Sequence, residues 1–213
     1  MALFGSYDLC VATQGTVAGF RNLLHHVVHQ RAAGEVRSFW AGLGAVRRSA
    51  FEAVGGFDAD RYPRPSIEDI ELGGRLARRG RILLDPALQG THLKEWTLGS
   101  MVHTDFARRG VPWVVLLVRQ RELPATLNLG MRERASAIAA VAVAWAVVRR
   151  RPLVAAAGIG AGIVLNCDLF THLYQQRGTR GVVAGIGLHT VHQLTAVAAV
   201  PAGLLDAGRS RNM

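Results

Sequence analysis

Cysteine is scarce in this sequence, and its scarcity excludes two kinds of architecture. The two cysteines, Cys10 and Cys167, lie far apart, and neither belongs to a CxxC pattern. A disulfide framework or a structural zinc site would need several cysteines at close spacing. The N-terminal residues, MALFGSYDLC, contain neither the basic residues nor the long apolar run of a signal peptide. These features favour a reducing compartment for the soluble part of the chain.

Acidic residues are also few, above all in the second half. The chain has 25 Lys and Arg against 15 Asp and Glu, and 50% of its residues are hydrophobic. Residues 101–213 carry a net charge of +8 and long Ala/Val/Gly/Leu runs, whereas residues 1–100 carry a net charge of +2. The arginines flank apolar runs and do not alternate with aromatics. This arrangement predicts a membrane partner and no nucleic acid, although a basic nucleic-acid binder remains an alternative that rests on charge alone.

Residues 1–100 alternate between helical and extended patterns, which is typical of an α/β domain. Glycine pairs and Asp-Pro separate the segments, because these residues favour turns. We expect, in chain order, an amphipathic helix at 17–33, a strand at 38–46, helical turns at 48–54, a loop at 58–66, a helix at 67–79 and a strand at 81–84.

The remainder of the chain is predicted to be a helical membrane region. Residues 101–131 form a linker whose run VPWVVLLV, between two arginines, is typical of a helix lying in the bilayer interface. Apolar segments follow at about 135–148, 153–167 and 182–205. The first two are shorter than the roughly 20 residues of a full span, which favours a tight hairpin or a re-entrant pair. The third is long enough to cross, so we expect a multi-pass protein whose orientation stays open.

The sequence PSIEDIELGGRLARRG, at 65–80, places three carboxylates in four positions before a helical run. Ser66 and Asp69 match a capping box with Ser66 as the N-cap. Acidic side chains in a first turn also suit the helix dipole. Capping explains these two residues without catalysis, but it leaves Glu68 and Glu71 unexplained.

Two other patterns suggest metal ligands, and each has a simpler interpretation. The Asp58-Ala59-Asp60 sequence follows Gly-Gly-Phe in a turn instead of ending an apolar strand, so a solvated loop is expected. His25 and His29 are four residues apart, but no Glu follows the first of them as in HExxH. We expect surface histidines on a helix.

Glycine patterns in the second half indicate helix packing. Gly158 and Gly162 form GxxxG within an apolar segment, which favours close contact between helices in a membrane. The same stretch, GIGAGIV, lacks GxGxxG spacing and a preceding soluble strand, which excludes a dinucleotide site. His189 and His192 lie on one face of the third segment, and helix packing is their expected role.

Residues 39–97 resemble a known family. The stretch FWAGLGAVRRSAFEAVGGFDADRYPRPSIEDIELGGRLARRGRILLDPALQGTHLKEWT resembles, without a gap, the C-terminal half of the catalytic domain of family 2 glycosyltransferases. The most specific match is GGF followed by ED-x-E-L-x-x-R-L-x-x-x-G. The resemblance extends to residues 6–30 and, more loosely, to the membrane segments, as in the membrane-bound branch of that family. It implies a partial GT-A, Rossmann-like domain over residues 1–100, followed by membrane helices over 132–213.

The resemblance also implies functional roles. Asp69 would be the general base of an inverting transfer, and Glu68 would shape the acceptor site. The donor would be a nucleotide-diphosphate sugar and the acceptor a lipid-linked species or a glycan, at the cytoplasmic face of the inner membrane. Substrate contacts are implied for Gly42, Gly44, Arg48, Gly56, Lys94 and Trp96, and a metal or diphosphate contact for His92.

One departure from the family limits what this chain is expected to do. The family's nucleotide-binding half, which carries the DxD ligands of a divalent Mg²⁺ or Mn²⁺, has no counterpart in the 213 residues. Three explanations stay open: a start recorded too late, a broken gene, or a partner chain that supplies this half. About 100 soluble residues are also expected to leave one side of the sheet uncovered. The alternative to an enzyme is an inactive remnant or a membrane interaction subunit.

Overall fold

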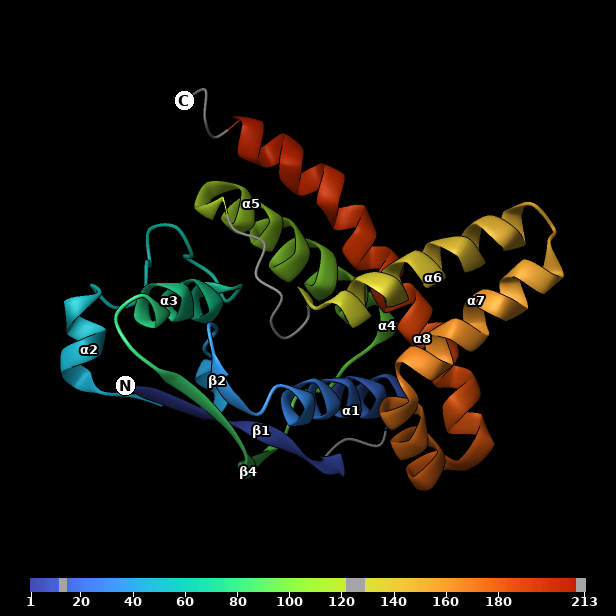
Figure 1. Cartoon of the computed structure of the whole chain (residues 1–213), viewed down its shortest axis with the longest axis horizontal. Coiled ribbons are helices and arrows are strands. Elements are labelled where there is room, and N and C mark those ends of the chain that lie inside the picture. The colour runs from blue at the N-terminus through green and yellow to red at the C-terminus, as the bar shows by residue number, and fades with distance from the viewer. Residues whose placement is uncertain (12–14, 122–128, 210–213) are drawn as a thin grey trace.

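The computed structural model describes residues 1–11, 15–121 and 129–209, so residues 122–128 of the expected linker lie outside the described part (Figure 1). The described chain is a mixed α/β unit followed by helices, as predicted. The first part contains β1 (Ala2–Val11), α1 (Thr16–Arg31), β2 (Gly34–Val36), the 3₁₀ turn η1 (Ala41–Leu43), β3 (Gly44–Val46), α2 (Arg48–Ala53), α3 (Glu68–Ala77) and β4 (Ile82–His92). The second part contains α4 (Leu98–His103), the π-helix η2 (Thr104–Gly110), α5 (Val111–Gln120), α6 (Met131–Val148), α7 (Pro152–Leu165) and α8 (Cys167–Arg209).

The four strands form one mixed sheet in the order β2-β4-β1-β3. Strand β1 is parallel to β4 and antiparallel to β3, and β2 is antiparallel to β4. The strand expected at 81–84 continues to His92, which corrects the prediction that Asp85-Pro86 ends it. The register between β1 and β4 shifts between Phe4 and Ser6, and such an irregularity accommodates a proline, which cannot donate to the ladder.

The strand expected at 38–46 is also shorter than predicted, because η1 precedes β3 and only residues 44–46 are extended. Glycine at position 42 has a packing reason. A Cβ atom there would lie 2.4 Å from the ring of Trp40, and one at Gly44 would lie 2.5 Å from the ring of Phe39. The small residues therefore let two aromatic rings fold back over this turn.

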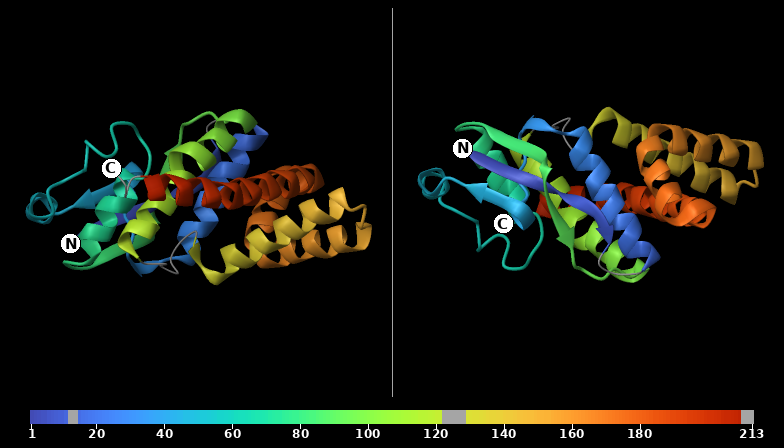
Figure 2. Two further views of the ribbon diagram at one scale, coloured as in Figure 1. Left: turned by 90° about the horizontal axis from the view of Figure 1, so that it is seen from above. Right: turned by 90° about the horizontal axis from the view of Figure 1, so that it is seen from below.

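Helices cover one face of the sheet and leave the other open. α1 and α3 lie on the same side of the strands, and the opposite side carries no described helix (Figures 1 and 2). Phe4, Ile82 and Leu84 are buried on the covered face. Leu83 and Leu88 of β4 are 39% and 45% exposed. The expectation of an uncovered side is thus confirmed.

Helix α1 is buried almost all round, which corrects the prediction of an amphipathic helix with surface histidines. Asn22 donates from Nδ2 to the carbonyl of Asp8, 2.8 Å away, and the ring of His26 lies 2.7 Å from the carbonyl of Tyr7. On another side, Phe20 and its neighbours pack against Leu169 of α8. A helix placed between a sheet and a second helix has little free surface, whatever its local pattern.

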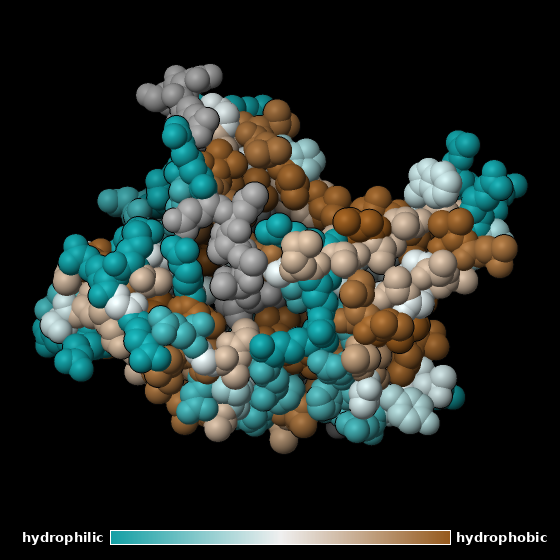
Figure 3. Space-filling model, in the orientation of Figure 1, coloured by the Kyte–Doolittle hydropathy of each residue, from teal (hydrophilic) through white to brown (hydrophobic). Residues whose placement is uncertain are grey.

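Of the last three helices, α6 and α7 form a hairpin, and α8 is a long helix that runs back toward the α/β unit. α6 and α7 are joined at Arg149–Arg151, and α8 breaks at Gly178, where φ is +60°. After the break α8 runs back across the molecule beside α1 and α5 (Figure 1). Hydrophobic side chains follow the α6–α7 hairpin, and hydrophilic ones gather at its tip (Figure 3).

By length and composition, α8 is the one candidate span among the described helices, and α7 is apolar but shorter. The several spans expected from the sequence are therefore not found by this criterion. Helix α8 contains the predicted third segment, 182–205, and also residues 167–181. The chain is helical on both sides of the break at Gly178. The expected hairpin of the two short segments is present.

The GxxxG pair provides a stability test within the hairpin. A Cβ at Gly158 would lie 2.7 Å from Cγ2 of Val143 and 3.2 Å from the carbonyl oxygen of Ala139, whereas one at Gly162 would meet nothing within 4 Å. Gly158→Ala should therefore lower the free energy of unfolding by about 1–3 kcal/mol through overpacking. Gly162→Ala should be neutral or stabilising by up to about 1 kcal/mol, because alanine favours helices.

The measurement is the thermal midpoint of both variants in the same detergent. Equal midpoints would contradict the close contact between α6 and α7 at Gly158.

Candidate functional site

The start of α3 is not capped as the sequence predicts. Its N-cap residue is Ile67, whose apolar side chain accepts no hydrogen bond from the first turn. The Ser66 hydroxyl instead donates to the carbonyl oxygen of Arg108, 2.6 Å away, while the Ser66 amide donates to Glu68, 2.6 Å away. The capping-box prediction is wrong because a long-range partner in η2 takes the hydroxyl. Glu68 acquires a local role, which is to hold the loop that enters the helix.

The Asp69 carboxylate joins α3 to η1. One oxygen accepts a hydrogen bond from the amide of Ala41 at 3.1 Å, and the other accepts from the amide of Ile70 at 2.8 Å. Burial raises the pKa of Asp69 above its ordinary value of 3.8, and the nearby charge of Glu68 acts in the same direction. The two backbone donors and Arg109 oppose this rise. A half-buried carboxylate with a raised pKa is more basic than an exposed one.

The π-helix η2 directs two charged side chains inward. Asp105 forms an ion pair with Arg21 of α1 at 3.0 Å and contacts Nδ1 of His192 of α8 at 2.7 Å. The side chains of Arg21 and Asp105 are 1% and 5% exposed. Four residues on, Arg109 approaches Nε2 of His25 to 3.4 Å. π-Helices are rare and occur often at functional sites, and this one links α1, α8 and the surroundings of Asp69.

The charge of Arg109 acts on titratable groups from several segments of the chain. Burial lowers the pKa of Lys94, and Arg109 adds to that effect. Burial raises the pKa of Asp105, but His192, Arg21 and Arg109 together outweigh it and lower that pKa. Arg109 also acts on Asp69 and on Tyr7, whose pKa is raised because burial outweighs the arginines. We call the groups on which the charge of Arg109 acts, together with the aromatic rings that contact them, the Arg109 site.

The histidines at the Arg109 site are kept neutral. Burial, aided by Arg21 and Arg109, lowers the pKa of His25 well below 6.5. Burial lowers the pKa of His29 to about 4 and also lowers that of His92, where Lys94 adds to the effect. At neutral pH the positive charge of the site thus comes from the arginines and Lys94.

Aromatic rings form one wall of the Arg109 site. The Tyr7 ring centroid lies 4.5 Å from that of Trp40 and 4.6 Å from that of His92, and both pairs are edge-on. The Trp96 ring stacks on His92 at 6.3 Å. Arg21 and Lys94 lie over the Trp96 ring at 4.9 and 3.9 Å. Such a wall suits the face of a sugar or a nucleobase next to an anionic group.

Two ring nitrogen atoms at the Arg109 site have no hydrogen-bond partner within the described protein. They are Nε1 of Trp96 and Nδ1 of His29, and both are buried. Buried polar groups are nearly always paired in folded proteins. These atoms are therefore candidates to bind a ligand or water.

The predicted site residues fall into two groups. The first group belongs to the Arg109 site and consists of Asp69, His92, Lys94 and Trp96. Gly42 lies in the η1 turn that Asp69 holds, and Gly44 directly follows that turn. Arg48 and Gly56 lie on and just after α2, at the outer end of the sheet (Figures 1 and 2). Arg48 is exposed and pairs with Glu52, and Gly56 has a φ of +66° in a turn.

A divalent metal does not fit this site as the described residues stand. Within residues 1–11, 15–121 and 129–209, no three His, Cys, Asp or Glu side chains gather closely enough to hold one. His92 instead packs between Tyr7 and Trp96. Asp58 accepts a hydrogen bond from the amide of Arg61 in its own loop, which agrees with the interpretation of a solvated turn.

Sequence reasoning missed Arg21 and Arg109. Arg21 lies on the same helical face as Val17, Leu24 and Val28, and a cation on an apolar face indicates a buried partner. Arg109 was interpreted only as a flank of the apolar run in α5. Nothing local shows that a π-helix turns it inward, since that geometry depends on packing against α8.

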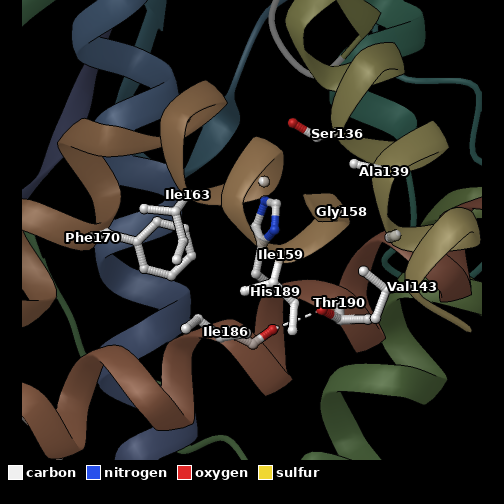
Figure 4. Close-up of a pocket in the computed structure, with 12 residues that line it drawn as sticks. Ser136, Ala139, Val143, Gly158, Ile159, Ile163, Phe170, Ile186, His189 and Thr190 are labelled. Carbon is white, nitrogen blue, oxygen red and sulfur yellow. Dashed lines mark hydrogen bonds between the residues drawn. The ribbon is translucent and has the colours of Figure 1, made fainter. Parts of the chain in front are cut away.

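A small cavity lies among the last three helices (Figure 4). Ser136, Gly158, Phe170, His189 and Thr190 are among its lining residues, and its volume is about 20 Å³. This is room for about one water molecule. The cavity is too small for a substrate, and the packing role expected for His189 agrees with its burial.

Comparison of the chain with protein-family models, with curated proteins and with solved structures finds no match.

Proposed function

We propose that this chain is the acceptor side of a membrane-associated glycosyltransferase, with Asp69 as the general base. The observation that supports it best is the environment of Asp69. Its carboxylate is half-buried, fixed by two backbone amides and basic for an aspartate. It holds Ala41, the residue after Trp40 of the aromatic wall, and the charge of Arg109 acts on it. The proposal combines this geometry with the resemblance of residues 39–97 to family 2 glycosyltransferases.

The proposed reaction is an inverting transfer. The acceptor hydroxyl oxygen attacks the anomeric carbon of a nucleotide-diphosphate sugar, and its proton passes to Asp69. The bond from the anomeric carbon to the diphosphate breaks, and the nucleoside diphosphate leaves with the bonding electrons. General-base catalysis needs a carboxylate within hydrogen-bonding reach of that hydroxyl. Arg109 and Lys94 offset the negative charge on the leaving group.

The membrane part of the proposal rests on α8 and the α6–α7 hairpin. Trp145, Val148 and Leu153 are 54–84% exposed, and α8 is long and apolar enough to cross a bilayer. We place the chain at the inner membrane, with the Arg109 site at the cytoplasmic face and a lipid-linked or glycan acceptor. A divalent metal would need ligands beyond those that the described residues supply.

Removal of the charge of Arg109 tests the proposal. Arg109→Gln should lower sugar transfer by about 10²–10³-fold, the effect of removing one stabilising group from a developing anion. The measurement is incorporation of radiolabelled sugar from a panel of nucleotide sugars into the lipid and glycan fractions of membranes that contain the chain. Arg79→Gln, an exposed residue beyond α3, is the control. Transfer by Arg109→Gln at the wild-type rate would contradict the assignment.

One observation favours an interaction subunit as a second candidate. The open face of the sheet exposes Leu43, Leu83 and Leu88 to 37–45%, which is typical of a surface that another protein segment covers. No transfer from any nucleotide sugar, by wild-type membranes in the same assay, would favour this candidate over the enzyme.

A further inference from the structure

A groove on the far side of η2 from the Arg109 site is lined mainly by basic and apolar side chains. Its volume is about 540 Å³. The loop before α3, η2, α5 and the end of α8 form its walls. In Figure 3, hydrophilic side chains gather over the loop before α3, and hydrophobic side chains cover much of α8. Neither the sequence motifs nor the proposed transfer assigns a role to this groove.

The charge of the groove is strongly positive. Arg61, Arg64, Arg108 and Arg119 line it, and Asp206 is the only carboxylate among its described lining residues. Within the described part of the chain, none of these four arginine side chains forms an ion pair. Several unpaired guanidinium groups around one hollow attract a phosphate, which they can bind through paired hydrogen bonds.

The other side of the groove is apolar. Pro112, Val115 and Leu116 line it from a single face of α5, because they are spaced by three and four residues. Helix α5 packs closely on α8, since a Cβ at Gly203 would lie 2.5 Å from Cβ of Val114. A groove with guanidinium groups on one side and aliphatic carbons on the other matches an amphiphile better than a soluble anion.

Exposed apolar side chains lie next to the groove. Beside Asp206 on α8, Leu204 and Leu205 are 52% and 68% exposed. Exposed leucines beside arginines are typical of a surface that contacts both acyl chains and headgroups. We propose that this groove binds the phosphate headgroup of an anionic membrane phospholipid. The inference does not depend on sugar transfer.

The test compares two triple variants of equal charge. Arg61→Gln/Arg64→Gln/Arg119→Gln removes three positive charges from the groove. Arg149→Gln/Arg150→Gln/Arg151→Gln removes three from the exposed tip of the α6–α7 hairpin. Both sets of side chains are exposed, so both variants should fold. Circular dichroism and gel filtration of the full-length chain in detergent verify this.

The measurement is a titration of each full-length protein with fluorescently labelled phosphatidic acid in mixed micelles. Each arginine close to an anionic lipid adds to the affinity, so the groove variant should bind at least about tenfold more weakly than wild type. The affinity of the tip variant should change by less than about twofold. Equal weakening in both variants would overturn the proposal in favour of net charge alone. Unchanged binding by the groove variant would also overturn it.

Glycerol 3-phosphate distinguishes the lipid from a soluble phosphate. It carries the same headgroup chemistry without acyl chains. The proposal expects it to compete only at concentrations far above those of the labelled lipid. Competition at comparable concentrations would show that the groove takes a soluble phosphate and would overturn the assignment to a membrane lipid.

Discussion

Asp69→Asn should lower sugar transfer by about 10²–10⁴-fold, the usual contribution of a general base, without loss of folding. Asparagine retains an oxygen that accepts the hydrogen bond from the amide of Ala41, so the link between α3 and η1 survives. It cannot take a proton from the acceptor. Among the predictions made for this protein, this is the largest expected loss of activity.

The same variant should have nearly wild-type stability at neutral pH, because two effects oppose each other. Asparagine has a single acceptor oxygen, so the amide of Ile70 loses its partner. The folded-state pKa of Asp69 is raised above 3.8, chiefly by burial. The folded state therefore binds this proton more tightly than the unfolded state, and stability from this group falls as pH rises from the unfolded pKa through the folded pKa. A neutral asparagine avoids that loss. For the same reason, the wild-type transfer rate should fall with decreasing pH already at a pH above 3.8, because Asp69 takes up its proton there.

The measurements are the transfer rate against pH and the thermal midpoint in detergent. Asp60→Asn, in the exposed loop before α3, is the matched control and should leave both unchanged. A fully active Asp69→Asn variant would remove Asp69 from the mechanism. Loss of activity together with a large fall in the midpoint would instead indicate a structural role.

Asp105→Ala should give the largest loss of stability, about 3–5 kcal/mol in the free energy of unfolding, because it leaves a buried cation without its partner. Arg21 is 1% exposed, and burial already lowers its pKa to about 10 although Asp105 opposes this. The substitution also removes the partner of His192. Three elements, α1, η2 and α8, would lose the contact that joins them.

Glu52→Ala is the matched control for this prediction. It removes an acidic partner from an arginine in the exposed Arg48–Glu52 pair, and exposed pairs contribute less than about 1 kcal/mol. Chemical unfolding of both variants in the same detergent measures the difference. If the two variants lose equal stability, the buried pair does not hold α1, η2 and α8 together.

The sequence alone determined the elements whose signals are local. The helices at 16–31, 48–53 and 68–77 follow from apolar spacing and glycine stops, and the α6–α7 hairpin follows from two short apolar runs around Arg149–Arg151. The α/β character of the first 100 residues and the open face of the sheet also followed from pattern and length. Asp69 was singled out by its neighbours in the sequence, and its catalytic role stays a prediction.

Tertiary packing alone decided the rest. Strand β4 continues past Asp85-Pro86 because β1 pairs with it beyond a register shift, and Ser66 leaves the helix cap because Arg108 offers a carbonyl. The Arg109 site is assembled by η2 from residues far apart in the chain. Charges and hydrogen-bond donors act through space over a few ångströms, and periodicity along the sequence does not record which distant groups the fold brings within that range.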